Sequence, residues 1–289
     1  MSAVESAAVC ADEPVRLRAA PPIRHIAFQV YPFVLAPRDF PNSRAGRRLI
    51  GMMEERRGVF RELCGEILGC RESFAEIPAH LESADTPHWH NIYLPPLDGM
   101  ILTALLKRQN PRLYVEIGSG SSTKFARKAI RDYGLQTRII SIDPEPRAEI
   151  DAICDEVVRA PFQDIGEQVL DLLSPGDVFF QDGSHHVFTN TDATVFFNEV
   201  APMLPRGITY GIHDIFLPLD YPATWNGRYY NEQYVWTSYL LAGACGHDIL
   251  FPAYFAGMDA ELSGSLDDVF ALPALAGLQR LGGAFWMQS

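Results

Sequence analysis

The stretch Arg112-Leu-Tyr-Val-Glu-Ile-Gly-Ser-Gly-Ser-Ser-Thr-Lys124 decides the fold that we predict for this chain. Residues 113–117 are a short apolar run with β-branched and aromatic side chains, which is typical of a buried strand. Gly118 and Gly120 interrupt the run, and helical spacing resumes at 125–130. Where a strand, a glycine turn and a helix meet, backbone N–H groups and the helix dipole face a ligand, and glycine lets the chain approach it closely. The stretch therefore indicates a nucleotide-like ligand, although an ordinary tight turn in an α/β protein would share these features.

Beyond the glycine turn, short apolar runs alternate with helical patterns, which predicts a parallel sheet with helices on both faces. The expected strands are 113–117, 137–142, 156–159, 177–181 and 208–212, with helices at 123–133, 147–153, 163–173 and 189–203. Two last strands, 247–251 and 283–287, are expected to form an antiparallel edge pair. The predicted fold class is therefore α/β, with a doubly wound, mostly parallel, Rossmann-like sheet of seven strands.

The first part of the chain has a different composition. Residues 1–20 are rich in alanine and mixed charge and lack the apolar core of a secretory signal, so we expect a flexible tail. Residues 21–96 form an expected N-terminal extension, with an extended segment at 23–35 and one amphipathic helix at 44–68. This extension could cover the mouth of an active site or form a homo-oligomer contact. The main domain is expected at 97–289.

The bulk composition excludes several classes of partner. The chain has 24 Lys and Arg against 36 Asp and Glu, a net charge of −12, which argues against nucleic acid and anionic membranes as partners. No apolar run approaches the roughly 18 residues that a membrane span needs. Five cysteines, an odd number without a CxxC pair, favour a reduced protein without structural zinc. We therefore expect a cytoplasmic protein that acts on a small molecule.

Polar residues gather at the expected carboxyl ends of the strands, where sheets of this kind bind ligands. They are Glu116, Gly118, Asp143, Asp182, His213 and Asp214. NAD binding would favour Gly-x-Gly-x-x-Gly, but Thr123 stands where the third glycine would be. Asp143 could hold the ribose hydroxyls of NAD or of another nucleotide cofactor. The sequence thus predicts a nucleotide site and disfavours NAD.

Two segments carry a resemblance to a known family. Val-Glu-Ile-Gly-Ser-Gly at 115–120 resembles the first motif of class I S-adenosylmethionine (SAM) methyltransferases, and Ser-Ile-Asp-Pro-Glu-Pro at 141–146 resembles their acidic second motif. The segment 177–186 resembles the fourth-strand motif of a subgroup with macrolide-sugar O-methyltransferases and cephalosporin-pathway relatives. The resemblance covers roughly 97–214 and the last strand, and it implies a SAM-dependent methyltransferase. The cofactor-binding residues that it implies are Glu116, Gly118, Ser119, Gly120, Ser122, Asp143, Phe162 and Asp182.

The resemblance also implies catalytic roles. In that subgroup an Asp-Gly-Ser-His segment supplies a metal-binding acid and a histidine base, which correspond here to Asp182 and His185. The acidic pair of the family's magnesium site reads His213-Asp214 in this chain, so one carboxylate is replaced by a histidine. The implied catalytic residues are Asp182, His185 and Asp214, and the implied metal ligands are Asp182, His213 and Asp214. By ligand chemistry, Mg, Mn, Fe or Zn could bind there, or these side chains could orient His185 and the acceptor without a metal.

Methyl transfer from a sulfonium requires an aligned acceptor and, for a hydroxyl acceptor, a base, for which a histidine is suited. An aromatic insert at 218–236 suits a sugar or an aromatic natural product, although a packed surface loop would have a similar composition. Its candidate substrate residues are Tyr221, Trp225, Arg228, Tyr229 and Tyr230. The alternatives that stay open are a SAM-binding protein without turnover, an N- or C-methyltransferase, an NAD-dependent oxidoreductase and an iron-dependent oxygenase.

Overall fold

The computed structural model describes residues 34–146 and 149–289. Residues 36–289 form one compact unit, to which the description below applies. The tail expected at 1–20 lies outside the described residues, as does the extended segment expected at 23–35 except for its last two residues. Within the described ranges, no helix is both long enough and apolar enough to cross a membrane.

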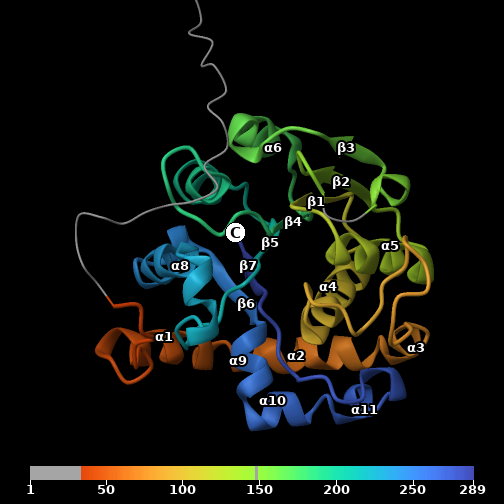
Figure 1. Cartoon of the computed structure of the whole chain (residues 1–289), viewed down its shortest axis with the longest axis horizontal. Coiled ribbons are helices and arrows are strands. Elements are labelled where there is room, and N and C mark those ends of the chain that lie inside the picture. The colour runs from red at the N-terminus through yellow and green to blue at the C-terminus, as the bar shows by residue number, and fades with distance from the viewer. Residues whose placement is uncertain (1–33, 147–148) are drawn as a thin grey trace, which may run out of the picture. The chain divides into compact units, whose positions relative to one another are not determined.

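The unit is built on a seven-stranded sheet of order β3-β2-β1-β4-β5-β7-β6 (Figure 1). The strands are β1 (Leu113–Ile117), β2 (Arg138–Ile142), β3 (Glu156–Val158), β4 (Val178–Gln181), β5 (Thr209–Ile212), β6 (Asp248–Pro252) and β7 (Phe285–Gln288). Strands β1 to β5 pair in parallel, and β7 is antiparallel to both β5 and β6. The predicted α/β fold with a mostly parallel sheet is confirmed. The expected antiparallel edge pair is also confirmed: β6 forms the edge of the sheet, and β7 lies between β5 and β6.

Helices cover both faces of this sheet. The longer ones are α1 (Arg44–Glu55), α2 (Arg57–Leu68), α4 (Pro96–Gln109), α5 (Ser121–Tyr133), α6 (Gly166–Leu172) and α8 (Glu232–Leu241). The shorter ones are α3 (Arg71–Ala75), α7 (Asp192–Val195), α9 (Ala253–Met258), α10 (Ala260–Gly264) and α11 (Asp267–Phe270). Three predicted helices are shorter than expected. The one expected at 163–173 is observed as α6, preceded by a 3-10 turn at Phe162–Asp164. A 3-10 turn at Asp151–Ile153 is the described helical part of 147–153, and α7 continues into π and 3-10 turns that end at Met203.

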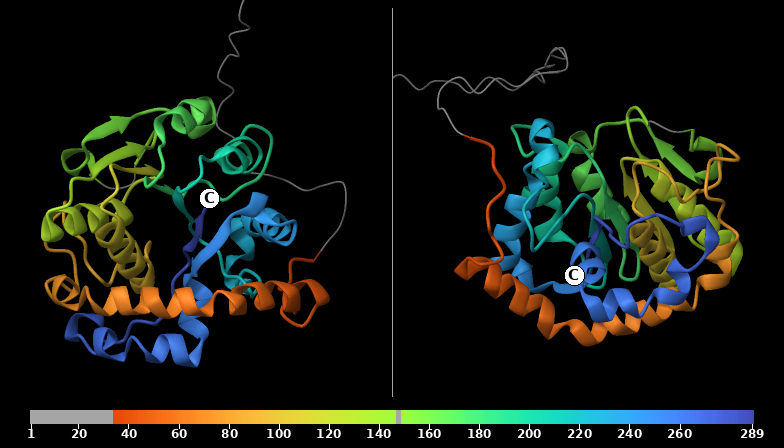
Figure 2. Two further views of the ribbon diagram at one scale, coloured as in Figure 1. Left: turned by 180° about the vertical axis from the view of Figure 1, so that it is seen from behind. Right: turned by 60° about the horizontal axis from the view of Figure 1, so that its bottom comes forward.

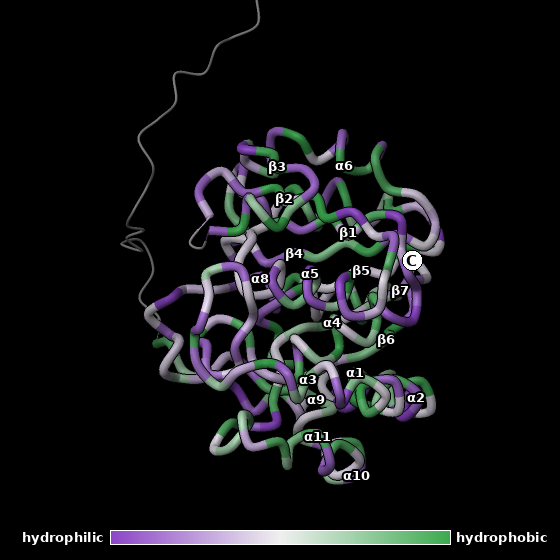
Figure 3. Tube along the Cα trace, turned by 90° about the vertical axis from the view of Figure 1, so that its right-hand side faces the viewer, coloured by the Kyte–Doolittle hydropathy of each residue, from purple (hydrophilic) through white to green (hydrophobic). Residues whose placement is uncertain are grey.

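Consecutive residues of β4 point to opposite faces of the sheet, as the pleat of a strand requires. The ring of Phe179 lies 6.2 Å from that of Phe162, whereas Phe180 stacks on Trp286 at 5.1 Å with an interplanar angle of 17°. A Cβ on Gly211 would lie 2.8 Å from the Trp286 ring and 2.9 Å from the Phe180 ring, so glycine makes this stack possible. Figure 3 accordingly shows β4 in the hydrophobic colour, as expected for a strand buried on both faces.

The helix expected at 44–68 is broken at Arg56 into α1 and α2, which follow each other along one side of the unit (Figure 2). Arg56 Nε donates a hydrogen bond to the carbonyl of Ile249 in β6 at 3.2 Å, and its guanidinium lies 3.6 Å from Asp248. This contact with a distant strand accounts for a break at a residue with good helix propensity. Helix α2 packs against α4, β6 and α10, so the expected extension is part of the same compact unit.

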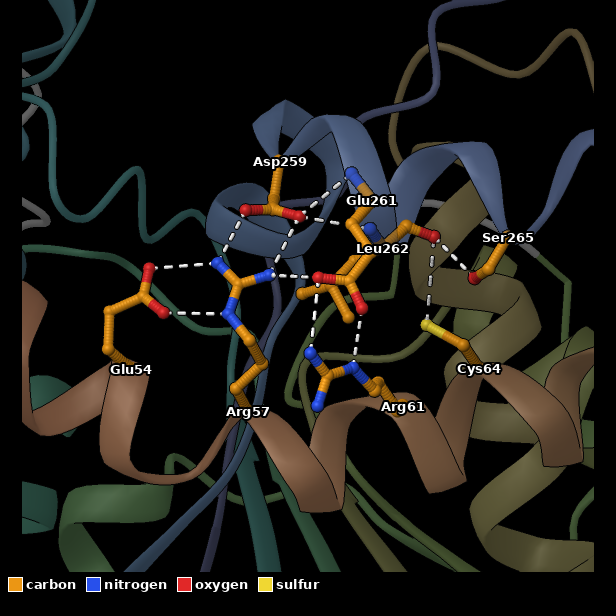
Figure 4. Close-up of polar contacts among 8 residues, drawn as sticks. All are labelled: Glu54, Arg57, Arg61, Cys64, Asp259, Glu261, Leu262 and Ser265. Atoms are coloured by element: carbon orange, nitrogen blue, oxygen red, sulfur yellow. Dashed lines mark hydrogen bonds and ion pairs between the residues drawn. The ribbon is translucent and has the colours of Figure 1, made fainter.

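An ion-pair network joins the N-terminal helices to α10 (Figure 4). Arg57 lies 2.7 Å from Glu54, 2.6 Å from Asp259 and 3.1 Å from Glu261. Arg61 pairs with the same Glu261 carboxylate at 2.5 Å. Because Asp259 also caps α10 by accepting from the backbone, the network fixes the position of α10 relative to α2.

Candidate active site

The turn between β1 and α5 requires glycine at one position and is open at another. Gly118 has a φ of 75°, and a Cβ there would lie 1.8 Å from the carbonyl oxygen of Asp182. Its N–H donates to the Ile142 carbonyl at 3.1 Å, which ties the turn to the end of β2. A Cβ on Gly120, in contrast, would meet no atom within 4 Å. The turn is therefore packed against the residue after β4 and leaves space beside Gly120 for a ligand.

Glu116 shapes this turn from beneath. It is completely buried, and it accepts a hydrogen bond from the Tyr114 hydroxyl at 2.8 Å and another from the Thr123 hydroxyl. Thr123 in turn accepts from the N–H of Gly120 at 2.9 Å. Burial raises the pKa of Glu116 to about 7, although hydrogen bonds from Ser122, Thr123 and Tyr114 oppose the shift. Glu116 and Ser122, both expected to bind the cofactor, are 0% and 3% exposed and support the turn from within.

Asp143 lies at the end of β2 beside the same turn. Its Oδ2 accepts from the N–H of Ser119 at 2.9 Å, and its Oδ1 accepts from the N–H of Glu145 at 2.8 Å. The residue is only half-buried, and each oxygen keeps a second lone pair for a hydroxyl donor. Phe162 is placed differently, because its ring is buried against Phe179 in the core.

Four ionisable side chains converge where β4 and β5 end. His185 Nε2 lies 3.3 Å from Asp182 Oδ1 and 3.4 Å from Asp214 Oδ2. His213 Nδ1 lies 3.3 Å from the same Asp182 oxygen and 3.6 Å from Asp214 Oδ1. The donor atoms of Asp182, His185 and Asp214 all lie within 4.8 Å of one another, a spacing that suits a metal ion. His185 and Asp214 also have positive φ angles, 60° and 57°, which are uncommon outside glycine and often mark functional sites. The structure thus brings together all four residues that the sequence nominated.

Each histidine is held on its far side by a buried carboxyl group that the sequence did not single out. Glu232, completely buried at the start of α8, accepts from His185 Nδ1 at 2.5 Å. Asp98, 1% exposed in the first turn of α4, lies 3.1 Å from His213 Nε2. Acids in the first turn of a helix are common because they interact with its dipole, so neither stood out in the sequence.

Burial and neighbouring charges together shift every pKa in this cluster for which a direction is resolved. Burial acts to lower the pKa of His185, but Glu232 and Asp182 outweigh it and raise that pKa well above the usual value. Burial is likewise outweighed at His213, whose pKa is raised by Asp182 and Asp214. Burial acts to raise the pKa of Asp182, yet His213 and His185 hold it well below its usual range. Burial raises the pKa of both Asp214 and Glu232. Coupled ionisable groups of this kind are typical of sites built for chemistry.

Part of the aromatic insert borders the cluster. The ring of Tyr230 lies 4.4 Å from that of His185. Trp225 stands perpendicular to Tyr230 at 5.7 Å, and the guanidinium of Arg228 lies 4.0 Å from the centre of the Trp225 ring. Aromatic ring faces therefore lie close to His185.

Other insert residues are placed less directly. Tyr221 is 5% exposed, and its hydroxyl accepts from the N–H of Gln233 at 3.3 Å, so its role is in packing. Tyr229 is 43% exposed. His186 lies with its Nε2 2.9 Å from the carbonyl of Arg228 and does not join the ionisable cluster.

Several solved structures are similar to this chain at low identity. The O-methyltransferase TomG from Streptomyces achromogenes, involved in tomaymycin synthesis and solved with SAM, has 19% identity and a TM-score of 0.33, covering 50% of this chain and 67% of its own. The cofactor-bound protein Rv0187 from MTB has 16% identity and a TM-score of 0.34, covering 78% and 89%. An O-methyltransferase from Bacillus cereus in complex with SAH has 15% identity and a TM-score of 0.34, covering 78% and 89%. These likenesses are distant, and no conclusion about the present chain rests on them.

The comparison with protein families is more direct. No curated protein matches the chain. The sequence pattern of a methyltransferase domain matches residues 115–215, which contain the glycine turn, Asp143 and the cluster at the ends of β4 and β5. The inserted antiparallel strand β7 also distinguishes this sheet from the usual dinucleotide-binding order 3-2-1-4-5-6, which disfavours the NAD alternative. Residues 115–215 thus match a methyltransferase domain, and the resemblance of the chain to class I SAM-dependent methyltransferases is confirmed.

Proposed function

We propose that this protein transfers the methyl group of SAM to a hydroxyl of a small molecule, with His185 as the general base. The observation that carries the proposal is the Glu232–His185 pair, with 2.5 Å between Oε1 and Nδ1. It stands next to a cofactor turn that is packed against the carbonyl of Asp182. A buried carboxylate that holds one ring nitrogen leaves the other nitrogen directed at the site, as in hydrolase triads.

SAM would bind along the β1–α5 turn. The open space beside Gly120 supports this placement, because no atom lies within 4 Å of a Cβ built there. Asp143, fixed by the N–H groups of Ser119 and Glu145, is positioned to accept hydrogen bonds from the ribose hydroxyls. Glu116 contributes indirectly, through its hydrogen bond with Thr123 that supports the turn.

The chemical step follows from this placement. The acceptor oxygen attacks the methyl carbon of SAM, the carbon–sulfur bond breaks, and S-adenosylhomocysteine leaves with the electron pair on sulfur. The hydroxyl proton passes to Nε2 of neutral His185, whose other nitrogen stays bound to Glu232. Because the pKa of His185 is raised, this neutral form needs a higher pH than that of an ordinary imidazole. A positioned base of this kind contributes about a hundred- to ten-thousand-fold in rate.

The surroundings of His185 favour a flat acceptor, either a sugar or an aromatic natural product. Tyr230 and Trp225 present perpendicular ring faces near His185, and Arg228 adds a cation over Trp225. The net charge of −12 speaks against a nucleic-acid acceptor.

Calorimetry tests the cofactor assignment without knowledge of the acceptor. Purified protein should bind SAM in the micromolar range, about −8 kcal/mol, and NAD should not bind measurably. Asp143→Ala should weaken SAM binding at least about tenfold, whereas Asp171→Ala, on the exposed side of α6, serves as the matched control. Tight NAD binding with no SAM binding would contradict the proposed function.

An assay of methyl transfer tests the assignment of His185 as the general base. Incubation with SAM labelled at the methyl group and small-molecule extracts should label an acceptor, and His185→Gln should reduce that rate by about a hundredfold or more while SAM affinity stays the same. Glu232→Gln should cause an intermediate loss, and His186→Ala is the control for an imidazole in the same segment that lies outside the cluster. If His185→Gln retains most of its activity, the base is a different residue or the acceptor is a nitrogen or carbon that needs none.

A further inference from the structure

His213 is buried in the site and held in a fixed orientation, as a metal ligand would be. It follows β5 directly, is 2% exposed, and its N–H donates to the Gln181 carbonyl at 2.9 Å. Its Nε2 faces Asp98 Oδ2 at 3.1 Å. Asp98 is itself fixed, because Oδ2 accepts from the N–H of Gly283 at 2.7 Å and Oδ1 from the N–H of Ala284 at 2.9 Å. The imidazole plane is therefore set by a carboxylate that cannot rotate.

The other nitrogen of this ring points at two carboxylates. Nδ1 of His213 lies 3.3 Å from Asp182 Oδ1 and 3.6 Å from Asp214 Oδ1. Those two side chains are more exposed than the imidazole, at 28% and 16%, so the point that the three groups share is accessible from solvent. One nitrogen of His213 and two carboxylate groups thus converge on a single position, and Nε2 of His185 contacts the same two carboxylates.

This donor set does not fit the magnesium ion that the family resemblance implies. Mg²⁺ binds oxygen ligands in a near-ideal octahedron, and the position where the resemblance implies a third carboxylate holds an imidazole. Imidazole nitrogen suits zinc, iron and related transition ions, and a ligating histidine almost always donates its second N–H to a carboxylate, as His213 can to Asp98.

We propose that Asp182, His213 and Asp214 form a site for a divalent transition ion, of the Zn²⁺, Fe²⁺ or Co²⁺ class, with Asp98 as the residue that positions His213. The inference rests on the proposed function, which identifies this cluster as the active site. It concerns only the binding of an ion, so it can be tested without measuring turnover. The proposed function assigns His185 to the base and not to the ion, although its Nε2 also lies 3.3 Å from Asp182 Oδ1 and 3.4 Å from Asp214 Oδ2.

Cobalt is the probe, because its visible absorption reports nitrogen and oxygen ligation directly. Chelator-treated full-length protein is titrated with Co²⁺ by absorption, and with Co²⁺ and Mg²⁺ by calorimetry. We expect one site that binds Co²⁺ about a hundredfold or more tightly than Mg²⁺. Preference for Mg²⁺, or no Co²⁺ binding, would overturn the inference.

Variants test each residue, with circular dichroism as the check on folding. His213→Ala should abolish the cobalt spectrum, and Asp98→Asn should weaken the affinity by about 10–100-fold while keeping the hydrogen bonds to Gly283 or Ala284. The double variant His213→Asp/Asp98→Asn should lose the preference for Co²⁺ over Mg²⁺. Asp214→Asn, at a more exposed position, replaces His213→Ala if that variant does not fold.

Two controls separate the possible failures. His186→Ala, an imidazole outside the cluster, should bind Co²⁺ like the wild type. If His185→Gln weakened Co²⁺ binding more than His213→Ala, the assignment of His213 would be wrong. SAM is titrated in parallel. Wild-type protein that binds SAM but does not prefer Co²⁺ over Mg²⁺ would contradict this inference alone. Wild-type protein that does not bind SAM would contradict the proposed function.

Discussion

Replacing Gly118 by alanine should damage both the fold and the site, and the structure gives the size of the effect. The residue has a φ of 75°, where an L-amino acid costs about 1–2 kcal/mol. The new Cβ would also lie 1.8 Å from the carbonyl oxygen of Asp182. That atom belongs to the backbone and cannot move aside by a rotamer change, so overpacking adds about 1–3 kcal/mol. The backbone strain and the overpacking together should lower the free energy of unfolding by about 2–5 kcal/mol.

Urea unfolding followed by circular dichroism measures this loss as a lower midpoint at unchanged slope. Gly120→Ala is the matched control, because its Cβ would meet no atom within 4 Å, and its stability should stay within about 0.5 kcal/mol of the wild type. The control should nevertheless bind SAM more weakly, because the methyl group occupies the space beside the turn. Should Gly118→Ala be as stable as the wild type, the described contact between the turn and Asp182 would be incorrect.

Two further perturbations test the electrostatics of the fold. The pKa of Glu116 is raised by burial from 4.5 to about 7, so its contribution to stability is complete below pH 4.5 and is lost as the pH rises through 7. Glu116→Gln should therefore remove a pH-dependent decline of at most roughly 3 kcal/mol, and an unchanged pH profile of unfolding would contradict the buried carboxyl. For the network of Figure 4, a double-mutant cycle on Arg57 and Asp259 should give a coupling of about 0.5–1 kcal/mol at neutral pH. Because the hydrogen bond from Arg57 lowers the pKa of Asp259, that coupling should persist above the usual carboxyl pKa and disappear as acid protonates Asp259; a coupling independent of pH would argue against an ionic contact.

Local patterns predicted the elements well, and contacts between distant segments account for the differences. The apolar runs placed each parallel strand within a residue of its observed bounds, because a strand buried on both faces needs a continuous apolar sequence. The position of β7 between β5 and β6 depends on pairing between distant strands, which no local pattern encodes. The break at Arg56 likewise results from a hydrogen bond to Ile249, far along the chain.

The same distinction applies to the site. Asp182, His185, His213 and Asp214 follow β4 and β5, so the topology of a parallel sheet was sufficient to predict that they lie together. The two carboxyl groups that orient the histidines come from helices packed on the sheet. Which side chains Asp98 and Glu232 contact depends on how the helices pack. In the sequence, both are ordinary acidic residues in the first turn of a helix. Residues that position others are for this reason harder to predict than the residues that they position.

The charge balance of the cluster leads to a last prediction. Two imidazoles face four carboxyl groups, those of Asp98, Asp182, Asp214 and Glu232, so the balance is negative if all four are ionised, even with both rings protonated. Burying such groups costs several kcal/mol each, and a positive occupant offsets part of that cost. The sulfonium of SAM is such an occupant, whereas S-adenosylhomocysteine is neutral at sulfur.

At an effective dielectric constant of about 20 and a separation of about 5 Å, one unit of opposite charge contributes about 3 kcal/mol before desolvation and screening. In protein freed of metal ions, SAM should therefore bind about tenfold more tightly than S-adenosylhomocysteine, or about 1.4 kcal/mol. The difference should narrow once Co²⁺ is bound, because the ion supplies the positive charge first. Calorimetry with both ligands, with and without Co²⁺, measures the two differences. If S-adenosylhomocysteine binds the ion-free protein as tightly as SAM does, the carboxyl groups of the cluster do not act on the sulfonium, and their charge is balanced within the protein.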